Sequence, residues 1–171
     1  MKIRPAREND LPALLDIYNG EVELGEATLD LNPRTLGEWR EWFLAHQTDA
    51  HFILVAEESG KPVGYASLSE YRKKEAYSST AELSVYIDRG FRRRGAASAL
   101  MEAVLEKARG CGKLHSVVSV ITSGNEASER LHAKFGFTFC GTMHEVGFKH
   151  GKFRDIDNYE LILEGNKCSV R

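Results

Sequence analysis

The sequence predicts a single α/β domain, in which a central mixed β-sheet is flanked by about four helices. Two features favour this class: short apolar runs rich in β-branched residues, and longer segments whose apolar residues recur at helical spacing. They alternate along a chain of 171 residues, which is long enough to bury one core. No internal repeat or low-complexity linker interrupts them, so we expect one domain over residues 1–171 with its core within 3–163.

The N-terminal segment is expected to form an edge strand followed by a helix. Ile3–Ala6 reads as a short strand, and Pro5 limits its pairing because proline has no N–H. Asn9 and Asp10 can cap the helix that follows. The apolar face of this helix would carry Leu11, Leu14, Leu15, Ile17 and Tyr18.

A second helix is predicted after Thr35, because Thr35 and Glu38 have the spacing of a capping box. Its aromatic residues recur at helical spacing, which indicates core packing rather than contact with a cofactor. These residues are Trp39, Trp42 and Phe43. Further on, a turn over Glu58–Lys61 joins two strands into a hairpin.

The remaining elements follow the same two patterns. We expect strands over 52–57, 62–68 and 80–87, a helix over 96–108, a buried strand over 116–121, a helix over 127–135, and a closing antiparallel pair over 137–146 and 154–163.

The composition limits the classes of ligand and partner. A net charge of −2 gives no electrostatic reason to expect a nucleic acid or a membrane as a partner. Cys111, Cys140 and Cys168 lack the spacing of metal ligands, so we expect reduced thiols and no metal. No apolar run resembles a signal peptide or a membrane span, so a cytoplasmic location is expected.

The most informative motif is a strand, a basic turn and a helix in direct succession between Ser84 and Val104. The turn carries Arg92, Arg93 and Arg94, and Gly95 lets the backbone approach a ligand closely. Free backbone N–H groups at the start of a helix bind phosphate, and the helix dipole supports them. The motif therefore predicts a site for a small phosphorylated ligand, the alternative being a merely solvated run of charge.

Two further positions could carry chemistry. Glu82 interrupts an otherwise apolar strand, and burial near a cleft would raise its pKa towards that of a useful base. Alternatively, it points outward on the polar side of an alternating strand. Asn125 can cap the predicted helix after it, and His132 lies seven residues on, so both side chains face the same way. A histidine there could move a proton or could be structural.

These motifs resemble a known family. Arg92-x-x-Gly95-x-Ala97 resembles the pyrophosphate-binding signature of the GNAT superfamily of acetyl-CoA-dependent N-acetyltransferases, and the predicted elements follow the order of that fold. Four stretches are similar to the phosphinothricin and methionine sulfone or sulfoximine N-acetyltransferases: Ile17–Asn19, Tyr71–Glu82, Asn125–His132 and Gly147–Asp155. The resemblance extends from Ile3 to about Leu163.

The resemblance implies an acetyl-CoA site and two catalytic residues. Contacts with acetyl-CoA are expected from Val85, Tyr86, Ile87, Arg92, Arg93, Arg94, Gly95, Ala96, Ala97, Ser98, Asn125 and Ser128. Glu82 has the spacing of the family's general base and would accept the amine proton. His132 stands where these enzymes usually carry a tyrosine that protonates the leaving thiolate, a role that an imidazole with an ordinary pKa could fill.

The resemblance also implies a homodimer that acetylates the α-amine of a small amino acid or analogue. Substrate contacts are expected from Leu29, Arg72, Lys74, Tyr77, Glu82 and Phe153. Lys74 stands where arginine is commoner, so the substrate carboxylate would be held by Lys74 or by Arg72. Leu29 and Phe153 also depart from the family pattern, and all three departures are expected in substrate-facing loops. Alternatively, Arg72–Lys74 is a solvated hairpin tip.

Two other functions are compatible with the same acetyl-CoA site. The acceptor could be the N-terminus or a lysine of another protein, with the basic stretch Arg72–Lys74 meeting an acidic partner. The chain could also be an acyl-CoA-binding module without catalysis, which would need neither Glu82 nor His132.

Overall fold

The computed structural model describes residues 1–163. Its elements, in chain order, are β1 (Lys2–Pro5), α1 (Leu11–Leu24), α2 (Leu36–Ala45), β2 (Phe52–Glu58), β3 (Lys61–Glu70), β4 (Thr80–Ile87), α3 (Ala96–Gly110), β5 (Ser116–Thr122), α4 (Glu126–Lys134), β6 (Thr138–Lys149) and β7 (Lys152–Ile162). Short 3₁₀ turns cover Glu8–Asp10, Glu75–Tyr77 and Arg89–Phe91.

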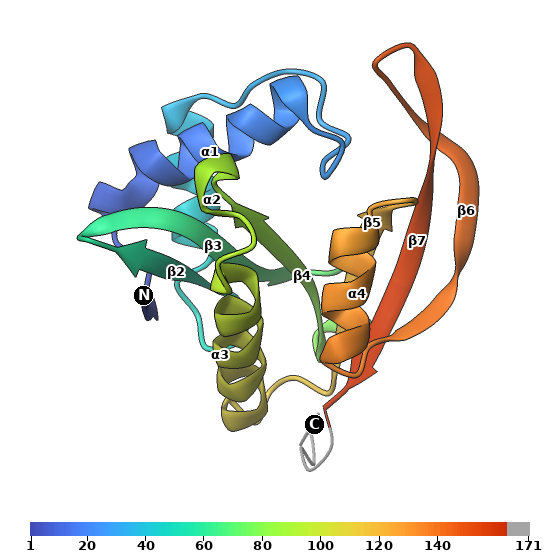
Figure 1. Cartoon of the computed structure of the whole chain (residues 1–171). Helices are drawn as coiled ribbons and strands as arrows, with labels where there is room; N and C mark the ends of the chain where they lie inside the picture. The colour runs from blue at the N-terminus through green and yellow to red at the C-terminus, as the bar shows by residue number, and fades with distance from the viewer. Residues whose placement is uncertain (164–171) are drawn as a thin grey trace.

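The strands form one mixed sheet in the order β1-β2-β3-β4-β5-β7-β6 (Figure 1). Neighbouring strands are antiparallel except β4 and β5, which run parallel. The parallel pairing covers only 80–82 of β4 and 116–118 of β5, after which the two strands diverge. The sheet therefore opens between a β1–β4 half and a β5–β7–β6 half.

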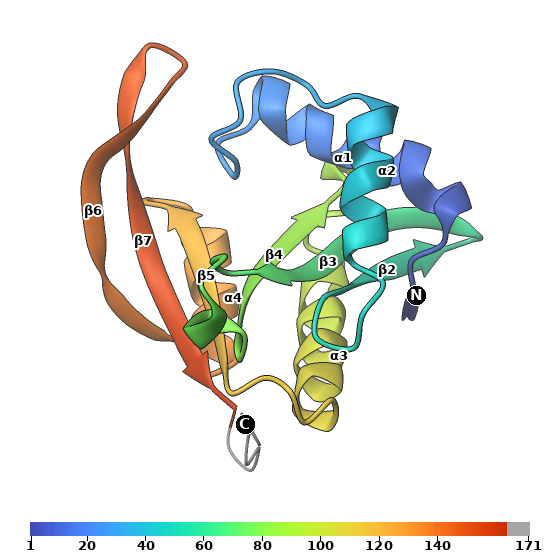
Figure 2. The same cartoon turned by 180° about the vertical axis from the view of Figure 1, so that it is seen from behind.

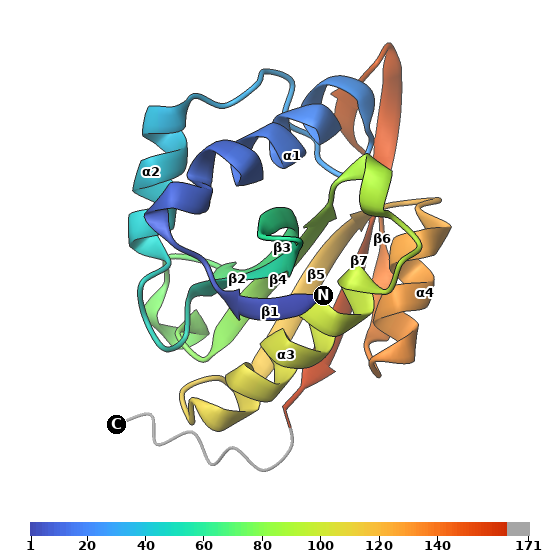
Figure 3. The same cartoon turned by 60° about the vertical axis from the view of Figure 1, so that its left-hand side comes forward.

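Helices cover both faces of the β1–β4 half (Figure 3). α3 packs on one face, where Leu100 and Leu54 belong to the same buried cluster. α1 and α2 pack on the other face, where Leu14, Trp39 and Val55 form a second cluster. Because successive side chains of a strand point to opposite faces, adjacent residues of β2 belong to different clusters. The expected α/β class, with a mixed sheet between helices, is confirmed.

The capping box of α2 is confirmed. The Glu38 N–H donates to the Thr35 hydroxyl at 3.3 Å, and the Glu38 carboxylate accepts from the Thr35 N–H at 2.8 Å. Trp39 and Phe43 are buried, as their helical spacing indicated. The strand expected over 80–87 has the bounds of β4.

The capping of α1 differs from the prediction. Asp10 occupies the N-cap position, but its carboxylate does not bond to the helix. It accepts instead from the Arg4 guanidinium at 2.7 and 2.8 Å and from the Arg7 N–H at 2.7 Å. The buried pair of Asp10 and Arg4 thus ties β1 to the start of α1.

The C-terminal strands also differ from the prediction. β5 is not buried along its whole length: Ser119 faces α4, whereas Val120 on the opposite face is 40% exposed. The closing strands are longer than expected, because the chain turns only at His150 and Gly151, whose φ angles are 52° and 73°. The resulting β6–β7 hairpin extends beyond the rest of the sheet (Figure 2).

Candidate active site

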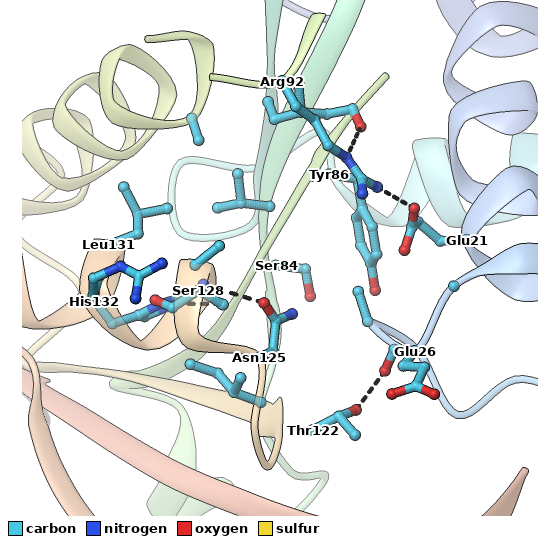
Figure 4. Close-up of a pocket in the computed structure, with 18 of the residues that line it drawn as sticks. Glu21, Glu26, Ser84, Tyr86, Arg92, Thr122, Asn125, Ser128, Leu131 and His132 are labelled. Atoms are coloured by element: carbon cyan, nitrogen blue, oxygen red, sulfur yellow. Dashed lines mark hydrogen bonds and ion pairs between the residues drawn. The ribbon is translucent and has the colours of Figure 1, made fainter. Parts of the chain in front are cut away.

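A cavity of about 910 Å³ occupies the opening between β4 and β5. Leu83–Ile87 line one side and Ser119–Thr122 the other. The turn before α3 and the N-terminal part of α4 complete the wall (Figure 4). The size is that of a cofactor site.

Backbone groups of β4 face this opening. The Leu83 carbonyl oxygen lies 3.4 Å from the Ser119 hydroxyl oxygen across the opening, and the Ile87 carbonyl accepts from Arg92 Nε at 3.5 Å. Backbone groups of alternate residues point to the same edge of a strand, so the N–H and C=O of Val85 also point into the opening. No strand of residues 1–163 pairs with that edge beyond Glu82. An extended ligand could therefore add here like a strand.

The turn before α3 presents uncapped N–H groups. Arg93 and Gly95 have positive φ angles of 60° and 87°. Gly95 is the N-cap residue, and it has no side chain to cap the backbone N–H groups of the first turn. The N–H groups of 96–98 therefore lack intrahelical partners at the positive end of the helix dipole. These residues line the cavity, so the predicted anion cradle is geometrically present.

Of the residues expected to contact acetyl-CoA, every one except Arg94 lines this cavity. The Arg94 guanidinium lies over the Phe91 ring and 3.6 Å from the Glu58 carboxylate, on the outer side of the turn. Arg93 makes no ion pair within 1–163, so its charge is available to a ligand.

Glu21 of α1 also lines the cavity, and it is not among the site residues expected from the sequence. Its buried carboxylate pairs with Arg92 and lies 3.3 Å from Arg89 Nε (Figure 4). This contact fixes the basic turn against α1 and neutralises part of its charge. A signal was present, because Glu21 lies four residues after Ile17 on the apolar face of the helix.

α4 brings Asn125 and His132 to the same wall of the cavity. The Asn125 amide oxygen caps α4 by accepting from the Ser128 N–H at 3.2 Å. His132 Nδ1 lies 2.8 Å from the Ser128 carbonyl, and His132 Nε2 lies 2.9 Å from the Ser119 hydroxyl. A carbonyl can only accept, so the neutral ring carries its hydrogen on Nδ1, and Nε2 accepts from Ser119.

The expectation of an ordinary pKa for His132 is wrong. The ring is buried, and burial lowers its pKa because the charged imidazolium is disfavoured there. The imidazole is therefore neutral at pH 7. Ser119, which was not among the expected site residues, stands between this ring and the β4 backbone.

Glu82 lies on the α1–α2 face of β4, because its neighbours Ala81 and Leu83 are buried on the α3 face. It is half-buried, and burial raises its pKa. Glu82 does not itself line the cavity, but Ser84, the next residue on the same face, does. The carboxylate is thus neither fully solvated nor remote from the opening.

The other residues expected to contact substrate do not line this cavity. Arg72 and Lys74 lie in the segment between β3 and β4, where both side chains are exposed. The Arg72 guanidinium is 4.9 Å from the ring centre of Tyr71 and 5.6 Å from that of Tyr77. Two aromatic faces therefore hold it in place.

Leu29 and Phe153 lie near the β6–β7 hairpin. A Cβ placed on Gly147 of β6 would come within 2.6 Å of Leu29 Cδ1, so the loop after α1 packs tightly on this strand. Phe153 belongs to β7, is 62% exposed and packs against Phe148. The expectation that all three family departures lie in loops is therefore wrong for Phe153.

Metal-binding groups, membrane-spanning helices and cysteines can be assessed for the described part of the chain. Within residues 1–163, no group of three or more histidine, cysteine or acidic side chains is arranged to hold a metal ion. No helix of that part is long and apolar enough to cross a membrane. Cys111 and Cys140 are free thiols, and Cys168 lies outside the described residues.

Comparison with known proteins gives consistent matches. The model of the acetyltransferase (GNAT) family matches residues 11–137. A phosphinothricin N-acetyltransferase of Streptomyces coelicolor is 40% identical over 95% of this chain and 96% of its own length. An L-methionine sulfoximine/L-methionine sulfone acetyltransferase of Pseudomonas aeruginosa is 38% identical over 98% of this chain and 97% of its own.

Solved structures agree with these matches. The ribosomal-protein-alanine N-acetyltransferase of Brucella melitensis superposes with a TM-score of 0.92 at 39% identity, over 95% of this chain and all 100% of the other. An acetyltransferase of Salmonella typhimurium, solved with its cofactor acetyl-CoA, gives a TM-score of 0.92 at 34% identity, over 96% and 94% of the two chains.

Proposed function

This chain belongs to the acetyltransferase (GNAT) family and is an N-acetyltransferase, and from that premise we propose that it acetylates the α-amine of small amino acids and their sulfone, sulfoximine and phosphinic analogues. Acetyl-CoA supplies the acetyl group as a thioester. The observation that carries the proposal is the opening between β4 and β5, which ends at the uncapped N-terminus of α3. Relatives that act on such analogues match nearly the whole chain.

The residues around the opening suit coenzyme A. The N–H groups of 93–98 would hold its diphosphate, with Arg93 adding charge. The backbone of Val85 and Ile87 would pair with its pantetheine arm, which the side chains of Asn125 and Ser128 border from α4. A Cβ on Gly95 would meet nothing within 4 Å, so the turn leaves room for a ligand.

Glu82 accepts the proton of the attacking amine, directly or through a water molecule. Its raised pKa brings a carboxylate closer to the basicity that proton removal needs. Arg72 holds the substrate carboxylate in preference to Lys74, because a guanidinium already held by two tyrosine rings loses little freedom on binding.

His132 acts by positioning Ser119 rather than as a charged general acid. Its neutral ring fixes the Ser119 hydroxyl beside Leu83, where the thioester sulfur would lie. We expect His132→Ala and Ser119→Ala each to lower kcat about tenfold, and the double variant to lose no more than either single variant. Steady-state kinetics of the three variants checks this.

The pH profile separates positioning from acid catalysis. The pKa of His132 is lowered from its usual value of 6.5, so the ring is already neutral at pH 7. If the neutral ring only positions Ser119, kcat should not change between pH 7 and pH 8. Additive losses, or a fall in kcat with rising pH that His132→Ala abolishes, would show that His132 donates a proton instead.

The test of the function is a free-thiol release screen with acetyl-CoA and single amino acids, their sulfone, sulfoximine and phosphinic analogues, and N-terminal peptides. Fastest turnover with an amino acid or analogue, and a product heavier by one acetyl group, supports the proposal. The Brucella melitensis neighbour favours a protein N-terminus as the second candidate acceptor, and faster turnover of peptides would decide for it.

The assembly is proposed to be a homodimer built on the β6–β7 hairpin. Phe139, Met143, Val146, Phe148 and Phe153 of this hairpin are exposed, and β6 is an edge strand. Sedimentation equilibrium should give twice the chain mass of 19.2 kDa. The expected cytoplasmic location and the expected lack of nucleic-acid and membrane partners stay predictions, which cell fractionation and binding assays would check.

A further inference from the structure

A second cavity, of about 320 Å³, lies between β3, β4 and the two N-terminal helices, on the face of the sheet that carries Glu82. It is lined by Tyr18, Arg34, Glu38, Trp39, Trp42, Tyr65, Ser67, Ser69, Ser84 and Tyr86. Ser84 and Tyr86 also line the cavity between β4 and β5. The two cavities therefore meet at these residues of β4.

The register of β3 and β4 determines which residues lie next to each other on the floor of this second cavity. Tyr65 is opposite Tyr86, and Ser67 is opposite Ser84. Ser69, at the far end of the floor, is opposite Glu82. The floor thus runs from an aromatic pair to a serine next to the proposed base. Two residues of a strand, about 6.7 Å, separate the aromatic pair from Ser67 and Ser84, and this distance suits a side chain of methionine length.

Two buried hydrogen-bond donors on residues that line this cavity have no partner within residues 1–163. They are the indole N–H of Trp39 and the hydroxyl of Tyr65, which are 6% and 1% exposed as residues. Buried donors are normally satisfied, because an unpaired one costs stability. The indole N–H can only donate, so what satisfies it must offer an acceptor atom.

We propose that this cavity takes the side chain of the acceptor amino acid, and that the Trp39 N–H and the Tyr65 O–H donate hydrogen bonds to oxygen atoms on that side chain. This rests on the proposed function and adds the group that selects the substrate. The α-amine then lies beside Ser84, which lines both cavities and follows Glu82 on the same face of β4, and the α-carboxylate faces the segment that carries Arg72.

The chemistry of the lining defines the substrate class. Aromatic walls from Tyr18, Trp42 and Tyr86 suit an unbranched aliphatic chain, and the two unpaired donors suit a sulfonyl, sulfoximine or phosphinyl group. Methionine sulfone and methionine differ only by two such oxygens. The wild-type protein should therefore prefer the sulfone.

Tyr65→Phe tests this, because it removes one hydroxyl and keeps the ring. Its KM for methionine sulfone should rise about 3- to 10-fold, while its KM for methionine stays unchanged. Its melting temperature should not fall, since the lost hydroxyl has no partner in the free protein. Trp39→Phe should shift the same preference, and Tyr159→Phe, at a residue of β7 that lines neither cavity, should not.

The possible outcomes distinguish a failure of this pocket assignment from a failure of the proposed function. If the wild-type protein acetylates neither compound, the proposed function fails and this inference fails with it. If it acetylates both and neither variant changes the sulfone-to-methionine ratio of kcat/KM, only the pocket assignment is overturned. Equal KM increases for both compounds, or a lower melting temperature of Tyr65→Phe with an unchanged ratio, would likewise assign Tyr65 a structural role.

Discussion

Glu82→Gln is expected to lower kcat about 100- to 1,000-fold at pH 7, because the amide cannot take a proton from the attacking amine. KM for both substrates should change little, since the two side chains have nearly the same shape. Initial rates of thiol release with acetyl-CoA and methionine sulfone check this. Glu106→Gln, an exposed substitution on α3, is the matched control and should retain wild-type turnover.

The pH dependence of activity is a second test of the role of Glu82. Burial raises the pKa of Glu82 above its usual 4.5, and only the ionised form is a base. Activity of the wild-type protein should therefore rise with pH through that raised pKa and then level off. In Glu82→Gln this limb should disappear.

The raised pKa of Glu82 also predicts how Glu82→Gln changes the stability of the fold. A carboxyl group whose pKa is raised on folding is destabilising once it ionises, so the cost appears as the pH rises through that pKa. The neutral glutamine lacks this cost, and the variant should melt no lower than wild type at pH 7. Wild-type turnover in a folded Glu82→Gln protein would show that another group takes the proton.

Ala97→Glu is expected to weaken coenzyme A binding at least 100-fold, because it places a carboxylate on the amides that would hold the diphosphate. Two like charges about 4 Å apart repel by about 4 kcal/mol at an effective dielectric constant of 20. Each 1.4 kcal/mol is about tenfold in affinity. Isothermal titration calorimetry with coenzyme A measures the loss.

The matched control is Ala97→Gln, which has the same size without the charge and should lose much less affinity. Ala97 lies in the first turn of α3, where a carboxylate is favourable to the helix dipole. The glutamate variant should therefore melt at least as high as wild type. Equal affinities in the wild type and Ala97→Glu would place the diphosphate elsewhere.

The sequence predicted features that depend on neighbouring residues. The basic turn before α3, the capping box of α2 and the Asn125 cap of α4 each lie within a few residues of chain, and each is present. The bounds of β4 follow from local alternation as well. Local patterns therefore located both walls of the cavity that we propose for acetyl-CoA.

Features that depend on long-range packing could not be predicted in this way. The opening beside β4 exists because the parallel pairing stops after three residue pairs, and no local pattern marks that point. Glu21 meets Arg92 across 71 positions of sequence. Burial in the folded chain lowers the pKa of His132, which the motif around it does not show.

The unpaired donors beside the second cavity also depend on long-range packing. Helical spacing correctly indicated that Trp39 is a core residue, but it cannot show that the indole N–H stays unpaired. That depends on which strand residue faces the helix, and Tyr65 is 26 positions away along the chain. An aromatic residue at helical spacing can therefore belong to the core and also line a cavity.

A crystal of this protein soaked with coenzyme A tests the account most directly. We expect density for the diphosphate over the main-chain nitrogens that open α3, and for the pantetheine arm alongside the free edge of β4. Density for the ligand at any other place, or none at saturating concentration in a lattice that leaves this opening accessible, would contradict the assignment on which the chemistry depends.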